Sequence, residues 1–439
     1  MSDSPKVWLT TLGCAKNQVD SDKVTAVLHD AGYGDAAAPD TADVVMVNTC
    51  AFIEPAREES INTVLELAAA KRVDAKLVVI GCMAQRYEQE LVEALPEADA
   101  VIGLDRYGEL VGNLDRLTKW QPLEIRPVQR SSMDILFETR RPTPSTPYAY
   151  VKVAEGCDKA CTFCAIPQFR GKQRSRRPDN IHAEVVGLAA AGVGEVVLVA
   201  QDLAAYGRDA DIAGGLEALV ARVADTPGLR RLRLYYLYPR EIRPALIETI
   251  ATTPNIVDYF DLSLQHVAPD LLRAMKRPGS GEAHLELIAD IRRKVPGAAL
   301  RSSFIVGFPG ETDGDVDELE AFLRVAELDW VGLFPYSAEE GTPAADFTHQ
   351  VDADDALERL RHLQAVQDEI TQARNAAQVG TTVEVLVDQV EDGQAVGRSY
   401  RQAPEIDGVI LLDEGTPGEW LTARILGAYG TDLEAQVVV

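Results

Sequence analysis

Three cysteines packed into eight residues constrain this chain more than any other feature of its sequence. Cys157, Cys161 and Cys164 are spaced Cys-x3-Cys-x2-Cys, so one turn of backbone can direct all three sulfurs at a single point. Scattered core cysteines would have no reason to cluster in this way, which argues against the alternative of three buried structural thiols. The sequence therefore predicts a metal centre.

The number of ligands indicates which kind of centre this is. A zinc site closed by protein needs four ligands, and no nearby Cys or His supplies a fourth. A cubane iron–sulfur cluster held by three thiolates leaves one iron open. The spacing, with the aromatic Phe163 just before the last cysteine, resembles that of the radical S-adenosylmethionine (SAM) enzymes. The resemblance implies that the open iron binds SAM and that an electron from the cluster cleaves it to a 5′-deoxyadenosyl radical.

Length and composition limit which classes of protein this chain can belong to. The 439 residues allow two or three domains, and the apolar fraction of 46% is that of a globular chain. Residues 1–6 lack the apolar stretch of a signal peptide, and no run of about 18 apolar residues could span a bilayer. Six cysteines without an export signal indicate a reducing compartment. We therefore predict a cytoplasmic protein with no membrane partner.

The other three cysteines, Cys14, Cys50 and Cys82, each follow an extended apolar run. The runs span residues 6–12, 44–48 and 76–80, and helical patterns lie between them at 19–31 and 54–70. Such alternation predicts beta-alpha units of a parallel sheet, in which the carboxyl ends of the strands form one ligand-binding rim. A single cysteine in this position is often only a small buried residue. Three in the same structural position favour convergence on a second cluster.

The motifs around these cysteines resemble the amino-terminal domain of the methylthiotransferases. They are Thr-Leu-Gly-Cys-Ala-Lys-Asn-Gln-Val-Asp-Ser at 11–21, Val-Asn-Thr-Cys at 47–50 and Ile-Gly-Cys at 80–82. Together with the SAM motif and the carboxyl-terminal segment, the resemblance covers essentially the whole chain. It implies that Cys14, Cys50 and Cys82 hold an auxiliary 4Fe-4S cluster, and that Cys157, Cys161 and Cys164 hold the cluster that reduces SAM.

The middle of the chain predicts an open partial barrel of six beta-alpha repeats, with chemistry at the carboxyl ends of its strands. Strands are expected at 148–154, 195–200, 231–237, 257–264, 300–306 and 330–336. Polar groups follow several of these strands. By resemblance, the residues that line the SAM and substrate cavity are Phe163, Gln201, Ser263, Gln265 and Gly307, with the Gly307 turn letting the backbone approach the methionine part of SAM.

Two features of this region leave alternatives open. For His266, a structural role and a role in the reaction are equally good explanations. The basic run at 169–177, Phe-Arg-Gly-Lys-Gln-Arg-Ser-Arg-Arg, is either a solvated loop or a group of cations that holds an acidic part of the substrate or of SAM.

The chain is thus predicted to be an α/β protein in four parts. Residues 1–119 form a Rossmann-like parallel-sheet domain, 120–147 a linker rich in Pro, Ser, Arg and Thr, and 148–378 the radical SAM partial (β/α)6 barrel, whose last helix at 352–378 closes it. Residues 379–439 contain about five short strands with turns at 392–393, 407–408 and 417–418. They resemble the small OB-like barrel (TRAM domain) that ends the methylthiotransferases.

Charge distinguishes the branches of that family. The chain has a net charge of −26, and residues 381–439 carry eleven Asp and Glu against three Arg, a net charge of −8. A barrel that grips RNA should be basic, whereas an acidic one suits a basic protein. We therefore expect the branch that modifies an aspartate of small-subunit ribosomal protein 12. The alternative is the branch that thiomethylates an adenosine derivative in transfer RNA, a partner that the negative charge disfavours.

The resemblance also implies the chemistry. No side-chain base in water removes hydrogen from an aspartate β-carbon at a useful rate, so a cofactor must carry that step. The deoxyadenosyl radical abstracts the hydrogen, and a sulfur methylated by a second SAM is delivered from the auxiliary cluster. An electron donor such as a flavodoxin or a ferredoxin is required, and the source of the sulfur stays open. A non-enzymatic iron–sulfur or zinc module of translation is the remaining alternative, and it leaves the six-repeat barrel unexplained.

Overall fold

The computed structural model describes residues 4–119 and 135–438, which form two compact units. Of the described residues, the first unit contains 4–119, 135–143, 155–158 and 165–176, and the second contains 144–154, 159–164 and 177–438. Most of the predicted linker, residues 120–134, lies outside the described residues. The domain boundaries at 119, 147 and 378 therefore stay predictions.

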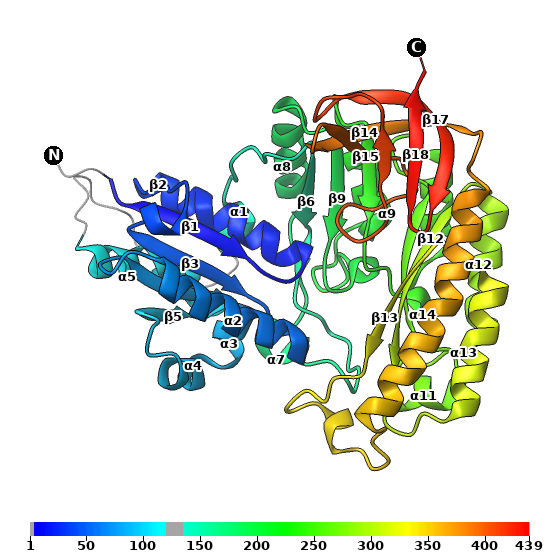
Figure 1. Ribbon diagram of the computed structural model, residues 1–439, viewed down its shortest axis with the longest axis horizontal. Coiled ribbons are helices and arrows are strands. Elements are labelled where there is room, and N and C mark those ends of the chain that lie inside the picture. The colour runs from blue at the N-terminus through cyan, green and yellow to red at the C-terminus, as the bar shows by residue number, and fades with distance from the viewer. Residues whose placement is uncertain (1–3, 120–134, 439) are drawn as a thin grey trace. The chain divides into compact units, whose positions relative to one another are not determined.

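The first unit is built on the predicted parallel sheet, with strand order β2-β1-β3-β4-β5 (Figure 1). The strands are β1 (Lys6–Thr11), β2 (Gly34–Asp35), β3 (Val44–Thr49), β4 (Lys76–Gly81) and β5 (Ala100–Ile102). The apolar runs at 6–12, 44–48 and 76–80 predicted β1, β3 and β4 to within a residue at each end. β2 and β5 were not predicted, because strands of two and three residues are too short to show periodicity.

The helices of this unit connect and cover those strands. They are α1 (Ala15–Asp30), α2 (Glu54–Ala70), α3 (Cys82–Arg86), α4 (Glu88–Ala94), α5 (Leu110–Thr118), α6 (Ile135–Glu138) and α7 (Ile166–Arg170). β3, at the centre of the sheet, is buried along its whole length, as expected for a parallel sheet covered on both faces. Two short strands, β7 (Ala154–Glu155) and β8 (Arg174–Ser175), flank the second cysteine motif in sequence.

The second unit contains the predicted open barrel of six parallel strands. They are β6 (Tyr148–Lys152), β9 (Glu195–Val199), β10 (Arg231–Leu234), β11 (Tyr259–Gln265), β12 (Ala299–Val306) and β13 (Trp330–Pro335). They form two three-stranded sheets that are joined by parallel bridges from Leu232 to Ile256 and from Leu237 to Leu262. β10 ends earlier than predicted because Tyr236 adopts a left-handed backbone with φ of 63°.

Helices cover the outside of this partial barrel (Figure 1). They are α8 (Pro178–Ala190), α9 (Gly215–Ala224), α10 (Pro244–Thr252), α11 (Pro269–Ala274), α12 (Gly281–Lys294), α13 (Asp313–Ala326) and α14 (Ala353–Ala376). α14 matches the predicted closing helix and packs on β13 and α13. None of these helices, nor any other in the described part of the chain, is long and apolar enough to cross a membrane.

The carboxyl-terminal strands close into the predicted five-stranded barrel, in the order β14-β15-β16-β18-β17. They are β14 (Thr382–Glu391), β15 (Gln394–Arg398), β16 (Ile410–Leu412), β17 (Trp420–Tyr429) and β18 (Asp432–Val437). Inward-facing residues such as Val385, Ile410 and Ile425 fill its core. The turn at 392–393 forms the predicted hairpin, whereas 407–408 lie in a longer connection from β15 to β16.

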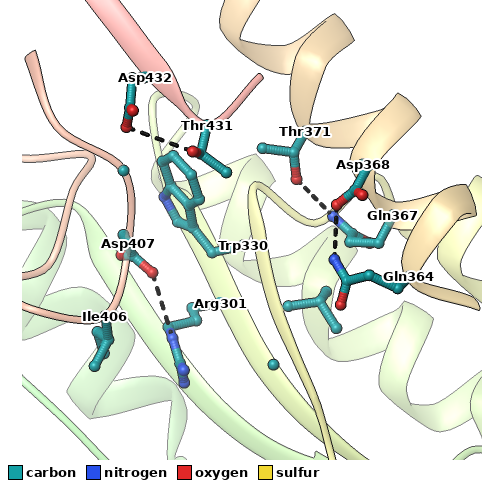
Figure 2. A pocket seen from close by; sticks show the side chains of 13 residues that line it. Arg301, Trp330, Gln364, Gln367, Asp368, Thr371, Ile406, Asp407, Thr431 and Asp432 are labelled. Carbon is teal, nitrogen blue, oxygen red and sulfur yellow. Dashed lines mark hydrogen bonds and ion pairs between the residues drawn. The ribbon is translucent and has the colours of Figure 1, made fainter. Parts of the chain in front are cut away.

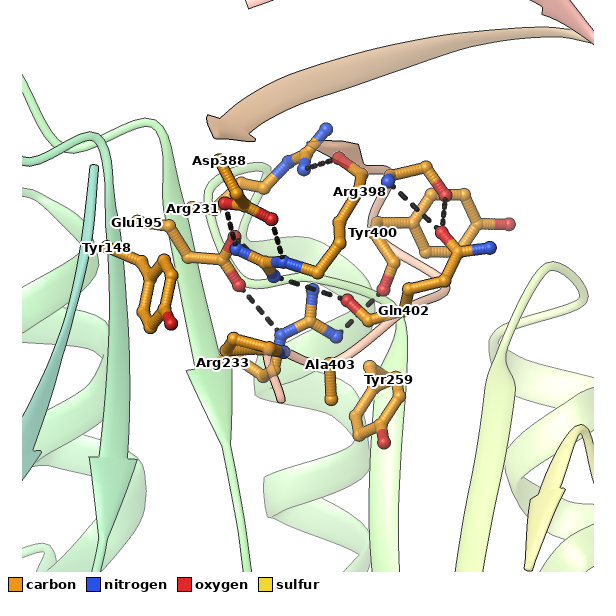
Figure 3. Close-up of polar contacts among 12 residues, drawn as sticks. Tyr148, Glu195, Arg231, Arg233, Tyr259, Asp388, Arg398, Tyr400, Gln402 and Ala403 are labelled. Carbon is orange, nitrogen blue, oxygen red and sulfur yellow. Dashed lines mark hydrogen bonds and ion pairs between the residues drawn. The ribbon is translucent and has the colours of Figure 1, made fainter. Parts of the chain in front are cut away.

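That longer connection, residues 399–409, docks on the amino ends of the partial-barrel strands (Figure 3). Arg233 of β10 donates to the Tyr400 carbonyl at 2.9 Å, and Trp330 of β13 donates to the Arg401 carbonyl at 2.7 Å. Tyr259 of β11 donates to the Asp407 carboxylate at 2.6 Å. The small barrel therefore lies at the end of the partial barrel opposite to the carboxyl ends, where the chemistry is predicted.

Candidate functional site

The first three cysteines lie where β1, β3 and β4 end, as predicted. Cys14 directly precedes α1, Cys50 directly follows β3, and Cys82 is the first residue of α3. The β3–β4 pairing, which sets Thr49 opposite Gly81, places Cys50 and Cys82 at the same level. Gly13 lies so close that a Cβ there would come within 2.8 Å of the Cys50 sulfur.

Asn17, a residue that sequence analysis passed over, ties the three loops together. Its buried amide nitrogen donates to the carbonyls of Leu12 and Thr49, at 2.9 and 3.1 Å, just before Cys14 and Cys50. Its amide oxygen lies 3.4 Å from the Cys82 sulfur. Only the Cys-Ala-Lys-Asn spacing could have suggested it, because an asparagine in the first turn of a helix is otherwise ordinary.

The environment of the three thiols suits a metal cluster. Burial, together with negative charge on the neighbouring thiols, raises the pKa of Cys50 to about 11 and that of Cys82 to about 12. Burial also raises the pKa of Cys14, but the charges of Lys16 and Arg170, together with backbone hydrogen bonds from Asn17 and Lys16, outweigh it and leave that pKa below its ordinary value. Three thiolates this close together need cations to hold them, which iron provides.

The sulfurs do not form a ready-made site for a single ion. Within residues 4–119 and 135–438, no three Cys, His, Asp or Glu side chains are grouped closely enough to hold one metal. A cubane has four irons, so each thiolate binds a different iron and the ligands stand farther apart than around one ion. Three cysteines are the donor set that holds such a cluster with one iron open, so the residues present fit it.

Arg170 at the end of α7 adds a buried cation to this site. Its Nε and Nη2 donate to the Cys82 sulfur at 3.2 and 3.0 Å, and its Nη1 pairs with Glu155 at 2.9 Å and with Asp20 at 3.2 Å. Arg170 is only 4% exposed. The interpretation of residues 169–177 as a solvated loop is therefore wrong for Arg170, which instead neutralises groups of its own protein.

In the second cysteine motif, Cys157 belongs to the first unit, whereas Cys161 and Cys164 belong to the second. In the first unit, the Cys157 N–H donates to the Gly171 carbonyl at 3.1 Å. Gly156 before it has φ of 79°, and a Cβ there would lie 2.1 Å from the Lys172 carbonyl oxygen. Only glycine fits this close approach of two backbone segments, so the first cysteine of the motif depends on it.

In the second unit, Cys161 and Cys164 belong to a tight turn in which the Cys164 N–H donates to the Cys161 carbonyl at 3.2 Å. Thr162 between them anchors the turn to neighbouring loops, donating its N–H to Met275 and accepting from Ala344. Arg277, which sequence analysis did not single out, places its Nη1 3.6 Å from the Cys161 sulfur. It also stacks over the Tyr238 ring at 4.2 Å.

Lys159, inside the motif, is held by two carboxylates that follow barrel strands. Its Nζ lies 2.5 Å from Glu241 and 3.4 Å from Asp202. Burial raises the pKa of Asp202 above its ordinary value, although Lys159 opposes the shift. Asp202 directly follows Gln201, which was predicted to line the SAM and substrate cavity, so the residue next to Gln201 pairs with a lysine of the motif itself.

The other predicted cofactor-binding residues lie at or beside the strand ends. Phe163 packs against an apolar cluster that includes Met275, Phe308 and Ala344. Ser263 and Gln265 lie at the end of β11, where the Ser263 carbonyl accepts from Arg277 and Gln265 has φ of 73°. Gln201 is partly buried directly after β9.

The structure gives a second reason for a glycine at position 307, in addition to the predicted approach of the backbone to SAM. Its φ is 79°, and a Cβ would lie 2.5 Å from that of Ala356 in α14. Its N–H donates to the Glu311 carboxylate at 2.9 Å. His266 is fully buried, accepts from the Ala268 N–H through Nδ1, and points Nε2 at Glu311 at 3.5 Å. These contacts favour a structural role for His266.

A cavity of about 230 Å³ in the second unit lies elsewhere (Figure 2). Arg301 and Trp330 of the partial barrel line it, together with Gln367 of α14 and Asp407 of the small barrel. Trp330 is the first residue of β13, and Asp407 belongs to the connection 399–409 that docks on the amino ends of the barrel strands. This cavity therefore lies at the amino ends of the strands. It is therefore separate from the predicted reaction site.

Comparison with known proteins identifies the class. Residues 151–323 match the radical SAM superfamily, residues 6–103 match the uncharacterized protein family UPF0004, and residues 379–438 match the TRAM domain. The radical SAM methyltransferase TsrM from Kitasatospora setae, solved with tryptophan substrate and a SAM analog, is similar in fold. It has a TM-score of 0.57 at 15% identity over 85% of this chain and 90% of that one. The protein is a radical SAM enzyme with an extra domain at each end.

Full-length relatives identify the family. The ribosomal protein uS12 methylthiotransferase RimO of Saccharopolyspora erythraea is 43% identical over 99% of this chain and 96% of its own length. The protein of the same name from Moorella thermoacetica is 43% identical over 97% of both chains. The chain belongs to this family of uS12 methylthiotransferases.

Proposed function

We propose that this protein is a transferase that attaches a methylthio group to the β-carbon of an aspartate in ribosomal protein uS12, using SAM and two 4Fe-4S clusters. The observation that carries the proposal is a second set of three cysteines at the rim of the amino-terminal sheet. A radical SAM enzyme that only abstracts hydrogen needs one cluster, whereas sulfur transfer needs a place to hold sulfur. The full-length relatives, which carry the name uS12 methylthiotransferase, support the substrate.

In this proposal Cys157, Cys161 and Cys164 hold the cluster that binds SAM, and the other set, Cys14, Cys50 and Cys82, holds the auxiliary one. When bound, the two clusters and SAM supply a carbon-centred radical and a methylated sulfur. The protein holds the segments that carry these cysteines in place. Around the SAM site, the Lys159 pairs with Asp202 and Glu241 fix the loop that carries the motif.

Residues Phe163, Gln201, Ser263, Gln265 and Gly307 are proposed to line the SAM and substrate cavity. Arg277 joins them, because it touches both the Ser263 carbonyl and the Cys161 sulfur. A cation beside a cluster ligand favours the reduced, more negative cluster. Arg277 would thus favour transfer of an electron to the SAM cluster.

The charge of the small barrel supports a protein substrate. Residues 381–439 carry a net charge of −8, which repels RNA and attracts a basic ribosomal protein. Methylthiolation of transfer RNA is accordingly not favoured.

We also propose a cytoplasmic location and an electron donor such as a flavodoxin or a ferredoxin. The proposed domain boundaries are at residues 119, 147 and 378.

Mass spectrometry of uS12 and of bulk transfer RNA, from cells with and without the gene, tests the proposal. We expect uS12 from cells that lack the gene to be lighter by one SCH2 unit, with transfer RNA unchanged. Loss of a methylthio group from transfer RNA, with uS12 unaltered, would show that the substrate is RNA and that the charge argument is wrong.

A further inference from the structure

Arg170 makes contacts that charge neutralisation alone does not explain. One of its terminal nitrogens, Nη1, satisfies both buried carboxylates, with Glu155 oxygens at 2.9 and 3.1 Å and an Asp20 oxygen at 3.2 Å. The other edge of the guanidinium, Nε and Nη2, is turned to the Cys82 sulfur. A residue that served only to balance Glu155 and Asp20 would not need this second edge.

The edge presented to Cys82 is a fixed pair of donors. Nε lies 3.2 Å and Nη2 3.0 Å from the sulfur, and Nη2 also donates to the Asn17 amide oxygen at 2.6 Å. A planar guanidinium presents these N–H groups in a rigid geometry, which an ammonium group cannot reproduce. Since Asn17 also ties down the loops before Cys14 and Cys50, Arg170 is linked by hydrogen bonds to all three cysteine segments.

Hydrogen bonds to a ligand sulfur have a defined effect on an iron–sulfur cluster. They orient the thiolate, and they stabilise the reduced cluster because its sulfurs carry more negative charge. Arg170 is always protonated, and it is buried where water does not screen it. It comes from the segment directly after the Cys157–Cys164 motif, six residues beyond the last cysteine.

We propose that Arg170 is a positioning residue of the auxiliary cluster, which it serves by holding the Cys82 thiolate through two N–H donors and by raising the reduction potential of that cluster. This inference rests on the proposed function only in assuming a cluster at Cys14, Cys50 and Cys82. No contact of Arg170 with substrate is required.

The test isolates the auxiliary cluster in the full-length chain. In a parent protein with Cys157, Cys161 and Cys164 all replaced by Ala, Arg170→Lys and Arg170→Gln are introduced separately. After anaerobic reconstitution, iron and sulfide per chain, the electron paramagnetic resonance spectrum of the reduced cluster and its midpoint potential are measured. Arg170→Lys keeps the charge near Glu155 and Asp20 but loses the paired donors.

We expect Arg170→Lys to bind as much iron as the parent, with a lower midpoint potential and an altered spectrum, and Arg170→Gln to show a larger shift or loss of iron. Arg176→Lys is the matched control. Arg176 is a buried arginine of the same segment that donates to the Phe137 carbonyl at 3.0 Å. Its substitution should leave the potential of the cluster unchanged.

Each other outcome decides against the proposal. An unchanged spectrum and potential in both folded Arg170 variants would overturn it, as would an equal shift in Arg176→Lys. An Arg170→Lys protein that no longer folds, as judged by circular dichroism, would assign the residue to the architecture of the unit instead. A parent that holds no cluster would overturn the assignment of Cys14, Cys50 and Cys82, and this inference with it.

Discussion

Arg398 of the small carboxyl-terminal barrel and Glu195 of the partial barrel form a buried ion pair, with Nη1 of the arginine 3.1 Å from Oε2 of the glutamate. Neither side chain is more than 2% exposed. Glu195 also pairs with Arg233 at 2.8 Å, and Arg398 also pairs with Asp388 (Figure 3). Glu195 is the first residue of β9 and Arg398 is the last residue of β15. Their ion pair therefore anchors the small barrel to the amino ends of the partial-barrel strands.

Removing the Glu195 carboxylate should weaken this anchor. Glu195→Gln removes the carboxylate that pairs with Arg233 and leaves Arg398 with Asp388 alone, and removing one partner of a buried pair costs about 3–5 kcal/mol in other proteins. We expect a loss of that order in the free energy of unfolding of the second unit, measured by urea denaturation. Glu217→Gln is the control, because its partner Arg243 is more than half exposed and water screens that pair. Equal losses in the two variants would contradict the prediction.

Acid should weaken the same anchor. Burial alone would raise the pKa of Glu195, but the charges of Arg398, Arg233 and Arg231 outweigh burial and lower it to about 2 from an ordinary 4.5. A depressed carboxyl pKa adds stability that is fully present above the unfolded value and is lost as the pH falls toward the folded one. We therefore expect the stability difference between wild type and Glu195→Gln to shrink from pH 4.5 to pH 2. A difference that stays constant over this range would exclude the linkage.

Asp407 should show the opposite pH dependence. Burial raises its pKa to about 6 from an ordinary 3.8, despite the attraction of Arg301. Because the folded protein holds this proton more tightly, the contribution of Asp407 to stability falls as the pH rises from 3.8 to 6. Thermal unfolding of wild type and Asp407→Asn across this range measures the effect. We expect the variant to gain stability relative to wild type as the pH increases.

Gly156→Ala should disturb the SAM cluster. The added Cβ would meet the Lys172 carbonyl oxygen at 2.1 Å, and φ of 79° is strained for alanine. We expect the variant to lose iron bound through Cys157 and to lose reductive SAM cleavage. Gly192→Ala is the control, since Gly192 also has a positive φ of 96° but open space around its Cβ. If both variants kept their iron, the close backbone approach would not be needed for the cluster.

Cys50→Ala should stop methylthio transfer without stopping SAM cleavage. With only Cys14 and Cys82 left, the auxiliary cluster is expected to be lost, which removes about half of the bound iron. SAM cleavage to 5′-deoxyadenosine should continue, while methylthio transfer to uS12 stops. Liquid chromatography with mass spectrometry follows both products in one assay. Cys161→Ala, in contrast, should abolish both, and a Cys50→Ala enzyme that still modifies uS12 would refute the role of the second cluster.

The local sequence determined the elements and the order of the ligands. Alternation of apolar runs and helical patterns located β1, β3 and β4 and placed Cys14, Cys50 and Cys82 at their carboxyl ends. The same signals predicted six barrel strands and the closed small barrel. These features depend on residues close together in the chain, where periodicity and spacing can be detected directly.

Only the tertiary structure decided how distant side chains meet. The Arg170 contact with Cys82 spans 88 residues, and the Arg398 pair with Glu195 spans 203. In sequence, Arg170 belongs to a basic run that could be a solvated loop or could hold an acidic group of the substrate or of SAM, and Arg398 is one of three cations in an acidic barrel. No local pattern records which carboxylate or sulfur will face a given guanidinium, because that is determined by the packing of whole strands and helices against one another.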